Sequence, residues 1–143
     1  WKLITRQEII ILHKSQCKMS TINTKYHRHL TTIDLDEDIV YVKSDMRPVS
    51  GVIYNDGKYP YEINYKEGKN HGTGRCWHSN GQIWSEKNYK KGVLHGMIRH
   101  WYENGIQQDE EKYENGNRIY KRCWEKDGSE IDASDPNYKW LFE

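Results

Sequence analysis

The sequence predicts an all-β fold, predominantly an antiparallel β-hairpin repeat array in the form of a meander sheet or solenoid, with a short N-terminal helix. Three observations predict this fold class. All 11 glycines of the 143-residue chain lie between Gly51 and Gly128, and most recur at regular spacing. Asn-Gly and Asp-Gly pairs separate short runs of β-favouring residues, which is the strongest local signal for hairpins. With one Ala and six Leu, a helical bundle is disfavoured.

The composition also predicts the kind of core. Leu, Ile, Val and Phe supply 26 residues, or 18% of the chain, a fraction at which disorder is ordinarily suspected. Against disorder stand 6 Trp and 11 Tyr, with 22 basic and 21 acidic residues. We therefore expect a core built from aromatic rings. The sequence has no run near 18 apolar residues to span a bilayer, and its net charge of +1 gives no long-range attraction to nucleic acid or anionic lipid.

Residues 1–37 are expected to form an N-terminal helix and an irregular capping segment. The stretch from Thr5 to Glu8 has the pattern of a capping box, and Ile4 and Ile9 occupy the positions of a hydrophobic staple. This predicts a helix over about residues 6–16, although its apolar run is equally compatible with a buried strand. We expect the segment to cover the first open edge of the sheet. The chain begins with Trp, which suggests a fragment or a trimmed terminus whose missing part could hold a targeting signal.

Residues 38–130 carry an internal repeat of about 24 residues, present three to three and a half times. Two series of glycines mark the turns of the hairpins: Gly57, Gly81, Gly105 and Gly128 in the first turn, and Gly68, Gly92 and Gly116 in the second. We expect the Asn-Gly and Asp-Gly pairs of the first turn to adopt the positive φ of tight hairpin turns. Such short connections place each strand beside its predecessor, which gives an antiparallel meander.

Aromatic residues keep the same register as the glycines. The residues expected to form the core of the repeats are Trp77, Trp101 and Trp124 in one column and Tyr65, Tyr89 and Tyr113 in another. A further column consists of Tyr54, His78, Tyr102 and Glu125. We interpret Tyr54, His78 and Tyr102 as a candidate binding stripe, because Tyr contributes a large contact area at low entropic cost. The alternative is that the N-terminal segment covers this face.

The spacing of these residues resembles that of a known repeat. The segments GTGRCWHSNG (72–81) and GMIRHWYENG (96–105) are similar to the MORN-variant repeat of the antitoxin-like, YwqK-type family, and residues 38–51 resemble the segment that precedes the first repeat there. The resemblance covers about residues 38–130. It departs in the last copy, where Tyr120 replaces a turn glycine and one residue is missing before Trp124, as expected of a terminal capping repeat. It implies an antiparallel hairpin array that acts as a protein-interaction or membrane-associating module.

Motifs for enzymatic chemistry do not fit the chain. A phosphate-binding loop, a dinucleotide-binding loop and a nucleophile elbow all fail on spacing or residue type. We therefore expect no enzyme, no catalytic residue and no cofactor. His27 and His29, with Asp34 and Asp36 nearby, leave a metal site as an alternative to a polar surface pair, and we assign no metal there.

Three other features with possible chemistry have simpler interpretations. His13 and Cys17, on one face of the predicted helix, make a weaker metal case. His71 and His95 are expected to fill a recurring niche beside the second turn. Cys76 and Cys123 lie two repeats apart, so their backbones should be about 20 Å from each other, well beyond disulfide reach.

The cysteines are therefore expected to be free thiols. Free thiols and an odd cysteine count favour a reducing, cytoplasmic compartment, with a virion also possible. The leading functional hypothesis is a non-enzymatic repeat scaffold for protein-protein interaction, without nucleic acid as a partner. The alternatives are a structural component of a large assembly such as a viral particle, and a peripheral module that binds anionic lipid. The tail 131–143, with its apolar group Tyr138, Trp140, Leu141 and Phe142, is expected to fold back or to dock on a partner.

Overall fold

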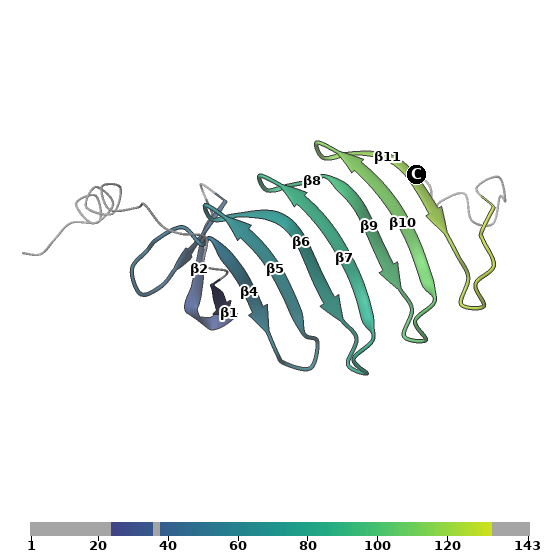
Figure 1. The fold of residues 1–143 in the computed structure, drawn as a ribbon, viewed down its shortest axis with the longest axis horizontal. Helices are drawn as coiled ribbons and strands as arrows, with labels where there is room; N and C mark the ends of the chain where they lie inside the picture. Colours follow the sequence, from purple (N-terminus) through teal and green to yellow (C-terminus); the bar gives the residue numbers. More distant parts are fainter. Residues whose placement is uncertain (1–23, 36–37, 133–143) are drawn as a thin grey trace, which may run out of the picture.

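The computed structural model describes residues 24–35 and 38–132 (Figure 1). The strands, with one 3-10 helix η1, are β1 Lys25–His27, η1 Arg28–Leu30, β2 Thr31–Asp34, β3 Ile39–Val42, β4 Gly51–Asn55, β5 Tyr61–Lys66, β6 Lys69–Trp77, β7 Ile83–Lys90, β8 Val93–Leu94, β9 Gly96–Trp101, β10 Gln107–Glu114 and β11 Asn117–Cys123. The predicted β-rich, hairpin-built fold is thus confirmed. The predicted helix, its His13 and Cys17, Asp36 and the apolar tail group lie outside the described residues.

One nine-stranded sheet runs through the molecule in the order β1-β4-β5-β6-β7-β9-β10-β11, with β8 also paired to β7. From β4 onward the neighbouring strands are antiparallel. The first edge differs from the prediction, because β1 pairs with β4 in parallel, Lys25 opposite Val52 and His27 opposite Tyr54. The separate β2–β3 hairpin lies in the connection from β1 to β4, which gives the chain the length that a parallel pairing needs.

The first turn of the later hairpins is a three-residue loop closed by two backbone hydrogen bonds. The amide of His78 donates to the carbonyl of Gln82 (2.8 Å) and the amide of Gly81 donates to the carbonyl of His78 (3.0 Å), and both bonds recur in the next two turns. Gly81 has positive φ and Asn80 does not, which is a type I turn followed by a left-handed residue. The expectation of positive φ for the asparagine is therefore wrong. Its side-chain Oδ1 instead accepts the amide of Gln82 (2.9 Å).

The second turn of each hairpin has positive φ at two successive residues, the signature of a type I′ turn. These pairs are Glu67 and Gly68 (52° and 78°), Lys91 and Gly92 (53° and 90°), and Asn115 and Gly116 (51° and 86°). Type I′ turns match the right-handed twist of the flanking strands, so the hairpins stay in register. Gly57 is the exception among the predicted turn glycines, since it lies in the loop between β4 and β5 without positive φ.

The buried core lies at the β1–β5 end of the sheet. Val42, Val49 and Ile53 form a buried cluster, with Val49 fully enclosed. Tyrosines at the edge of this cluster, among them Tyr61 and Tyr65, are only partly buried. This corrects the expectation of an aromatic core. Among the described residues the buried hydrophobic side chains are Val42, Val49, Val52, Ile53, Ile98 and Cys123, because a thin sheet cannot enclose large rings.

The six residues expected to form the repeat core are all half-buried: Trp77, Trp101, Trp124, Tyr65, Tyr89 and Tyr113. In the region from β6 to β11 the described chain forms one curved layer of strands (Figure 1). Among the described residues, no helix is long and apolar enough to cross a membrane.

Candidate binding surface

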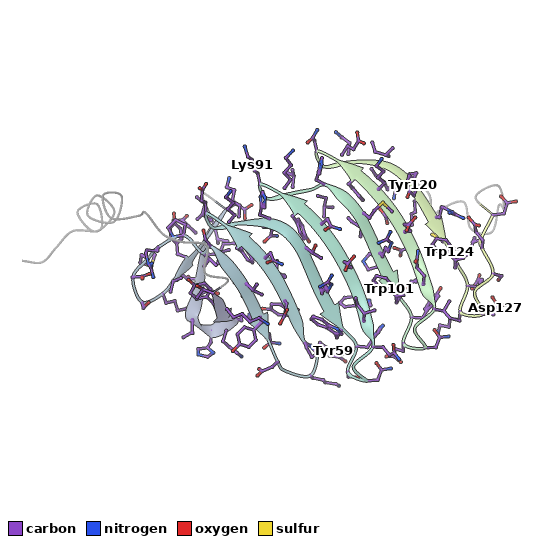
Figure 2. The ribbon with its side chains drawn as sticks, viewed as in Figure 1. Tyr59, Lys91, Trp101, Tyr120, Trp124 and Asp127 are labelled. Atoms are coloured by element: carbon purple, nitrogen blue, oxygen red, sulfur yellow. The ribbon has the colours of Figure 1, made fainter. Side chains whose placement is uncertain are left out.

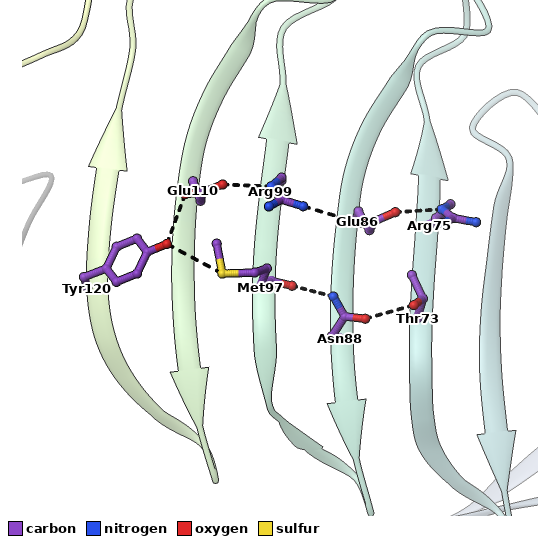
Figure 3. A network of polar contacts seen from close by, with 8 residues as sticks. All are labelled: Thr73, Arg75, Glu86, Asn88, Met97, Arg99, Glu110 and Tyr120. Carbon is purple, nitrogen blue, oxygen red and sulfur yellow. Dashed lines mark hydrogen bonds and ion pairs between the residues drawn. The ribbon is translucent and has the colours of Figure 1, made fainter.

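A row of alternating charges crosses one face of the sheet. Residues that stand directly opposite one another on six consecutive strands are Glu62, Arg75, Glu86, Arg99, Glu110 and Arg122. We call this set the charge ladder. Arg75 Nε lies 2.8 Å from a carboxylate oxygen of Glu86, and Arg99 Nε lies 2.8 Å from one of Glu110 (Figure 3).

The ladder is extended at both ends. Lys25 Nζ lies 2.6 Å from Glu62, and Arg122 forms a two-pronged contact with Glu130 at 2.8 and 2.9 Å. The hydrogen bonds from Arg122 lower the pKa of the Glu130 carboxyl. Charge on this face is thus neutralised largely within the molecule, which leaves little net field to attract a charged partner.

Sequence reasoning missed the ladder, although a signal was present. The three arginines are spaced 24 and 23 residues apart, and Glu62, Glu86 and Glu110 are spaced 24 and 24. The same periodicity that identified the glycines would have found them. The residues could also have been paired by charge, since directly opposed opposite charges stabilise neighbouring strands.

A second polar row runs beside the ladder. Thr73 Oγ1 donates to the Oδ1 of Asn88 (2.9 Å), whose Nδ2 donates to the carbonyl of Met97 (2.7 Å). The hydroxyl of Tyr120 donates to Glu110 (3.0 Å) and also lies 3.6 Å from the sulfur of Met97 (Figure 3). Tyr120, which breaks the glycine pattern, therefore joins the last strand to the two rows.

Two of the three residues of the predicted binding stripe hydrogen-bond to the backbone of the following hairpin. His78 Nε2 lies 2.9 Å from the carbonyl of Trp101, and the hydroxyl of Tyr102 donates to the carbonyl of Trp124 (2.9 Å). Because a carbonyl can only accept, the proton of His78 is on Nε2. Tyr54 instead lies within β4 and packs edge-on against the ring of His27. The structure thus joins His78 and Tyr102 in one type of contact and leaves Tyr54 apart from them.

The turn asparagines form the same kind of connection. Asn80 Nδ2 donates to the carbonyl of Glu103 (2.9 Å), and Asn104 Nδ2 donates to the carbonyl of Lys126 (3.0 Å). Each asparagine therefore shapes its own turn through Oδ1 and holds the next turn through Nδ2. These contacts fix the relative positions of the turns along one rim of the sheet, the rim marked by Asp127 in Figure 2.

A half-open pocket of about 280 Å³ lies along this rim. Its lining residues are His78, Trp101, Tyr102, Glu103, Asn104, Gln108 and Lys126. Trp101 and Tyr102 supply the aromatic surface, and Lys126 Nζ lies 5.7 Å from the centre of the Tyr102 ring. Figure 2 shows Trp101 in the half of the sheet nearer the rim marked by Asp127, away from the opposite rim, where Lys91 lies. The pocket offers an aromatic wall with polar groups at its mouth, a combination typical of recognition sites.

Gln108, which lines the pocket, lies 24 residues after Trp84 and so occupies the corresponding position of the next hairpin. Trp84 lies in a β-bulge between the pairs Trp77–Ile83 and Cys76–Ser85. Gln108 lies in the same kind of bulge, between the pairs Trp101–Gln107 and His100–Asp109. The Trp84 ring stands 6.2 Å from the ring of His78. At Gln108 the smaller side chain leaves room beside Tyr102, the residue that corresponds to His78.

The opposite face brings a serine, a histidine and an aspartate into one cross-strand row. Ser85 stands opposite His100, which stands opposite Asp109, and His100 Nδ1 lies 2.6 Å from an Asp109 oxygen. Ser85 is 3% exposed, and its buried hydroxyl has no hydrogen-bond partner. An activated serine needs contact with the base and access to substrate, so this trio lacks the geometry of a nucleophilic triad.

Cysteines and the repeated histidines behave as the sequence predicted. Cys76 and Cys123 are free thiols, and burial raises the pKa of both. The Nδ1 of His71 accepts the amide of Lys91 (3.4 Å), and that of His95 accepts the amide of Asn115 (3.3 Å). Both rings thus fill the niche beside a second turn.

Comparisons with family models, with curated proteins and with solved structures gave no match for this chain. The class of protein is therefore defined by the fold alone: a predominantly antiparallel hairpin sheet with a pocket on one rim.

Proposed function

We propose that the chain is a non-enzymatic hairpin repeat scaffold, similar to MORN-variant proteins, that binds a protein partner at the pocket around Trp101. The single observation that carries this proposal is the room left by Gln108 where the preceding hairpin has Trp84. A partner that inserts an apolar or aromatic side chain would occupy the place of an indole ring. Hot spots of protein interfaces have this character, with a ring in a pocket surrounded by polar contacts.

The charges around the pocket favour a protein partner over a highly charged partner. The charge ladder is paired internally, so the potential near the pocket comes from few groups. Glu103, with a side chain 76% exposed, and Lys126 stand at the mouth with opposite charges. Such a rim suits the polar backbone and mixed side chains of a polypeptide.

The test uses the full chain and introduces at position 108 the residue that the preceding hairpin has at the corresponding position, Trp84. Gln108→Trp should fill the pocket as Trp84 fills the corresponding place, with little change in fold. We expect proteins captured from native material by the immobilised wild-type chain to be lost with Gln108→Trp. The Kd of an identified partner should rise about 30-fold, equivalent to about 2 kcal/mol.

Two matched variants separate docking from structural effects. Trp84→Gln changes the corresponding bulge and should leave the partner's affinity unchanged. Thr73→Val removes the hydrogen bond to Asn88, neither residue of which lines the pocket, and should lower stability by about 1 kcal/mol with little effect on binding. If Gln108→Trp keeps the wild-type circular dichroism spectrum and the wild-type affinity, the pocket is not the docking site.

A further inference from the structure

Two histidines and an aspartate meet at the first edge of the sheet, away from the pocket. His27 ends β1, and His29 lies in the 3-10 turn η1 that follows it. Their Nδ1 atoms are 2.6 Å apart and their ring centres 4.4 Å apart. The 3-10 turn begins directly after His27 and brings the two rings together.

Asp56 fixes the tautomer of the first ring. Its Oδ1 lies 3.1 Å from His27 Nε2, and an ionised carboxylate can only accept, so the proton of His27 is on Nε2. The lone pair of His27 is then on Nδ1, the atom that accepts the backbone amide of His29 (3.5 Å) and faces the second ring.

We propose that His27 and His29 bind a divalent transition metal ion of the Ni²⁺, Cu²⁺ or Zn²⁺ class through their Nδ1 atoms, with Asp56 as a positioning residue. Neutral imidazole is a preferred ligand of these ions. A ligating histidine ordinarily donates its other ring N–H to a carboxylate, which is the contact that Asp56 provides.

The geometry is within reach of coordination. Two metal–nitrogen bonds of about 2.0–2.1 Å at a tetrahedral angle place the nitrogens about 3.3 Å apart. From 2.6 Å, the two rings need to separate by less than about 1 Å, with His29 changing tautomer so that its Nδ1 offers a lone pair. Tyr54 packs edge-on against His27, with ring centres 5.1 Å apart at 81°, and limits its rotation.

The site would be an open one. In the part of the chain that the structure describes, no group of three or more His, Cys, Asp or Glu side chains is arranged to hold a metal. Two imidazoles therefore supply the protein ligands, and water or a small ligand completes the coordination. The site lies on the exposed edge turn, with the His27 side chain 26% exposed, so exchange with solvent is possible.

The test titrates the full chain with Cu²⁺ alone, which binds most tightly among these ions. Calorimetry should give one ion per chain, and electron paramagnetic resonance should show coupling to two nitrogens. His29→Ala should abolish this two-nitrogen signal. Because His29 is exposed, this variant should keep its fold, which circular dichroism checks.

Asp56→Asn provides the sharper measurement. It keeps an acceptor for His27 but removes the charge, and the Cu²⁺ affinity should fall at least about 10-fold. Asp127→Asn changes the corresponding aspartate of the last turn and should leave the affinity unchanged. The proposal is overturned if His29→Ala binds Cu²⁺ with the wild-type affinity and spectrum, or if His13→Ala alone removes the signal.

Discussion

The two ends of the sheet are held together by different physical means. At the β1–β5 end, Val42 and Val49 from outside the main sheet pack on Ile53 and form the buried cluster. From β6 to β11 the described chain has no such cluster, and neighbouring strands are joined by the charge ladder, the second polar row and the contacts between turns. The two ends of the sheet are thus stabilised in different ways.

The difference teaches how a sheet with few aliphatic residues holds its shape. Burial of a Val or Ile side chain contributes about 1.5–3 kcal/mol, whereas an exposed ion pair contributes about 0.2–1 kcal/mol. The β6–β11 region must therefore rely on many small contacts repeated in every hairpin. We expect single substitutions to have larger effects at the β1–β5 end.

The same deletion at both ends gives the largest expected effect. Ile53 and Ile98 are both buried, at 5% and 3% exposure, but only Ile53 belongs to the buried cluster. Ile53→Ala should lower the free energy of unfolding by about 3 kcal/mol and Ile98→Ala by about 2 kcal/mol, because half-buried neighbours can relax into the smaller gap. Urea unfolding monitored by Trp fluorescence measures both. Equal losses would contradict the comparison.

Two turn glycines at corresponding positions provide the next test. Both need positive φ, but a Cβ on Gly68 would clash with an Ile39 methyl and lie 3.0 Å from the Val40 carbonyl oxygen, whereas a Cβ on Gly116 would meet nothing within 4 Å. Gly116→Ala should cost about 1 kcal/mol from backbone strain alone. Gly68→Ala should cost about 2–3 kcal/mol, since it must also displace the β3 segment. Thermal unfolding compares them, and a smaller shift for Gly68→Ala would count against the close packing of β3.

A smaller effect is expected in the charge ladder. Glu86 lies 2.8 Å from Arg75 and 3.9 Å from Arg99, so Glu86→Gln weakens two contacts. The loss should be about 0.5–1 kcal/mol at low salt and should shrink in 1 M NaCl, where the Debye length is about 3 Å. Glu103→Gln, at an exposed rim position, is the control and should change nothing. A loss that is independent of salt would argue against an electrostatic role.

The smallest expected effect is in the pH dependence of the free energy of unfolding, which should differ between substitutions at the two ends of the sheet. Burial raises the pKa of Glu110, but hydrogen bonds from Arg99 and Tyr120 outweigh it and hold the pKa below its usual value. Because the folded pKa is lower than the unfolded value of about 4.3, Glu110 stabilises the fold above that pH and loses this contribution as the pH falls through the folded pKa. Glu110→Gln should flatten the acid limb of stability against pH. The difference between Ile53→Ala and wild type should stay constant over the same range.

Local sequence signals predicted most of the fold. Gly81 and Gly92 mark turns whose backbone few other residues can adopt, so spacing alone located the hairpins and their strands. Local sequence signals did not predict the buried cluster. Val42 and Val49 lie outside the 24-residue pattern, and their burial depends on where the β2–β3 segment meets the sheet.

Side-chain roles along the rim were predicted less well. The spacing grouped His78 with Tyr102 as part of a binding stripe, but it did not predict the hydrogen bonds that both make to the next hairpin. The bulges at Trp84 and Gln108 interrupt the alternation of faces, so counting residues along a strand no longer tells which side a residue occupies. The pocket follows from that interruption and from the difference in size between the two side chains.

The sequence by itself determined where the turns lie and the order in which the strands from β4 onward pair, because these depend on φ restrictions and on connections of a few residues. Only the tertiary structure decided that β1 pairs in parallel with β4, that small aliphatic residues form the buried core, and that His27, His29 and Asp56 meet at one edge. The physical reason is distance along the chain: these contacts join segments whose approach depends on how a connecting hairpin folds between them.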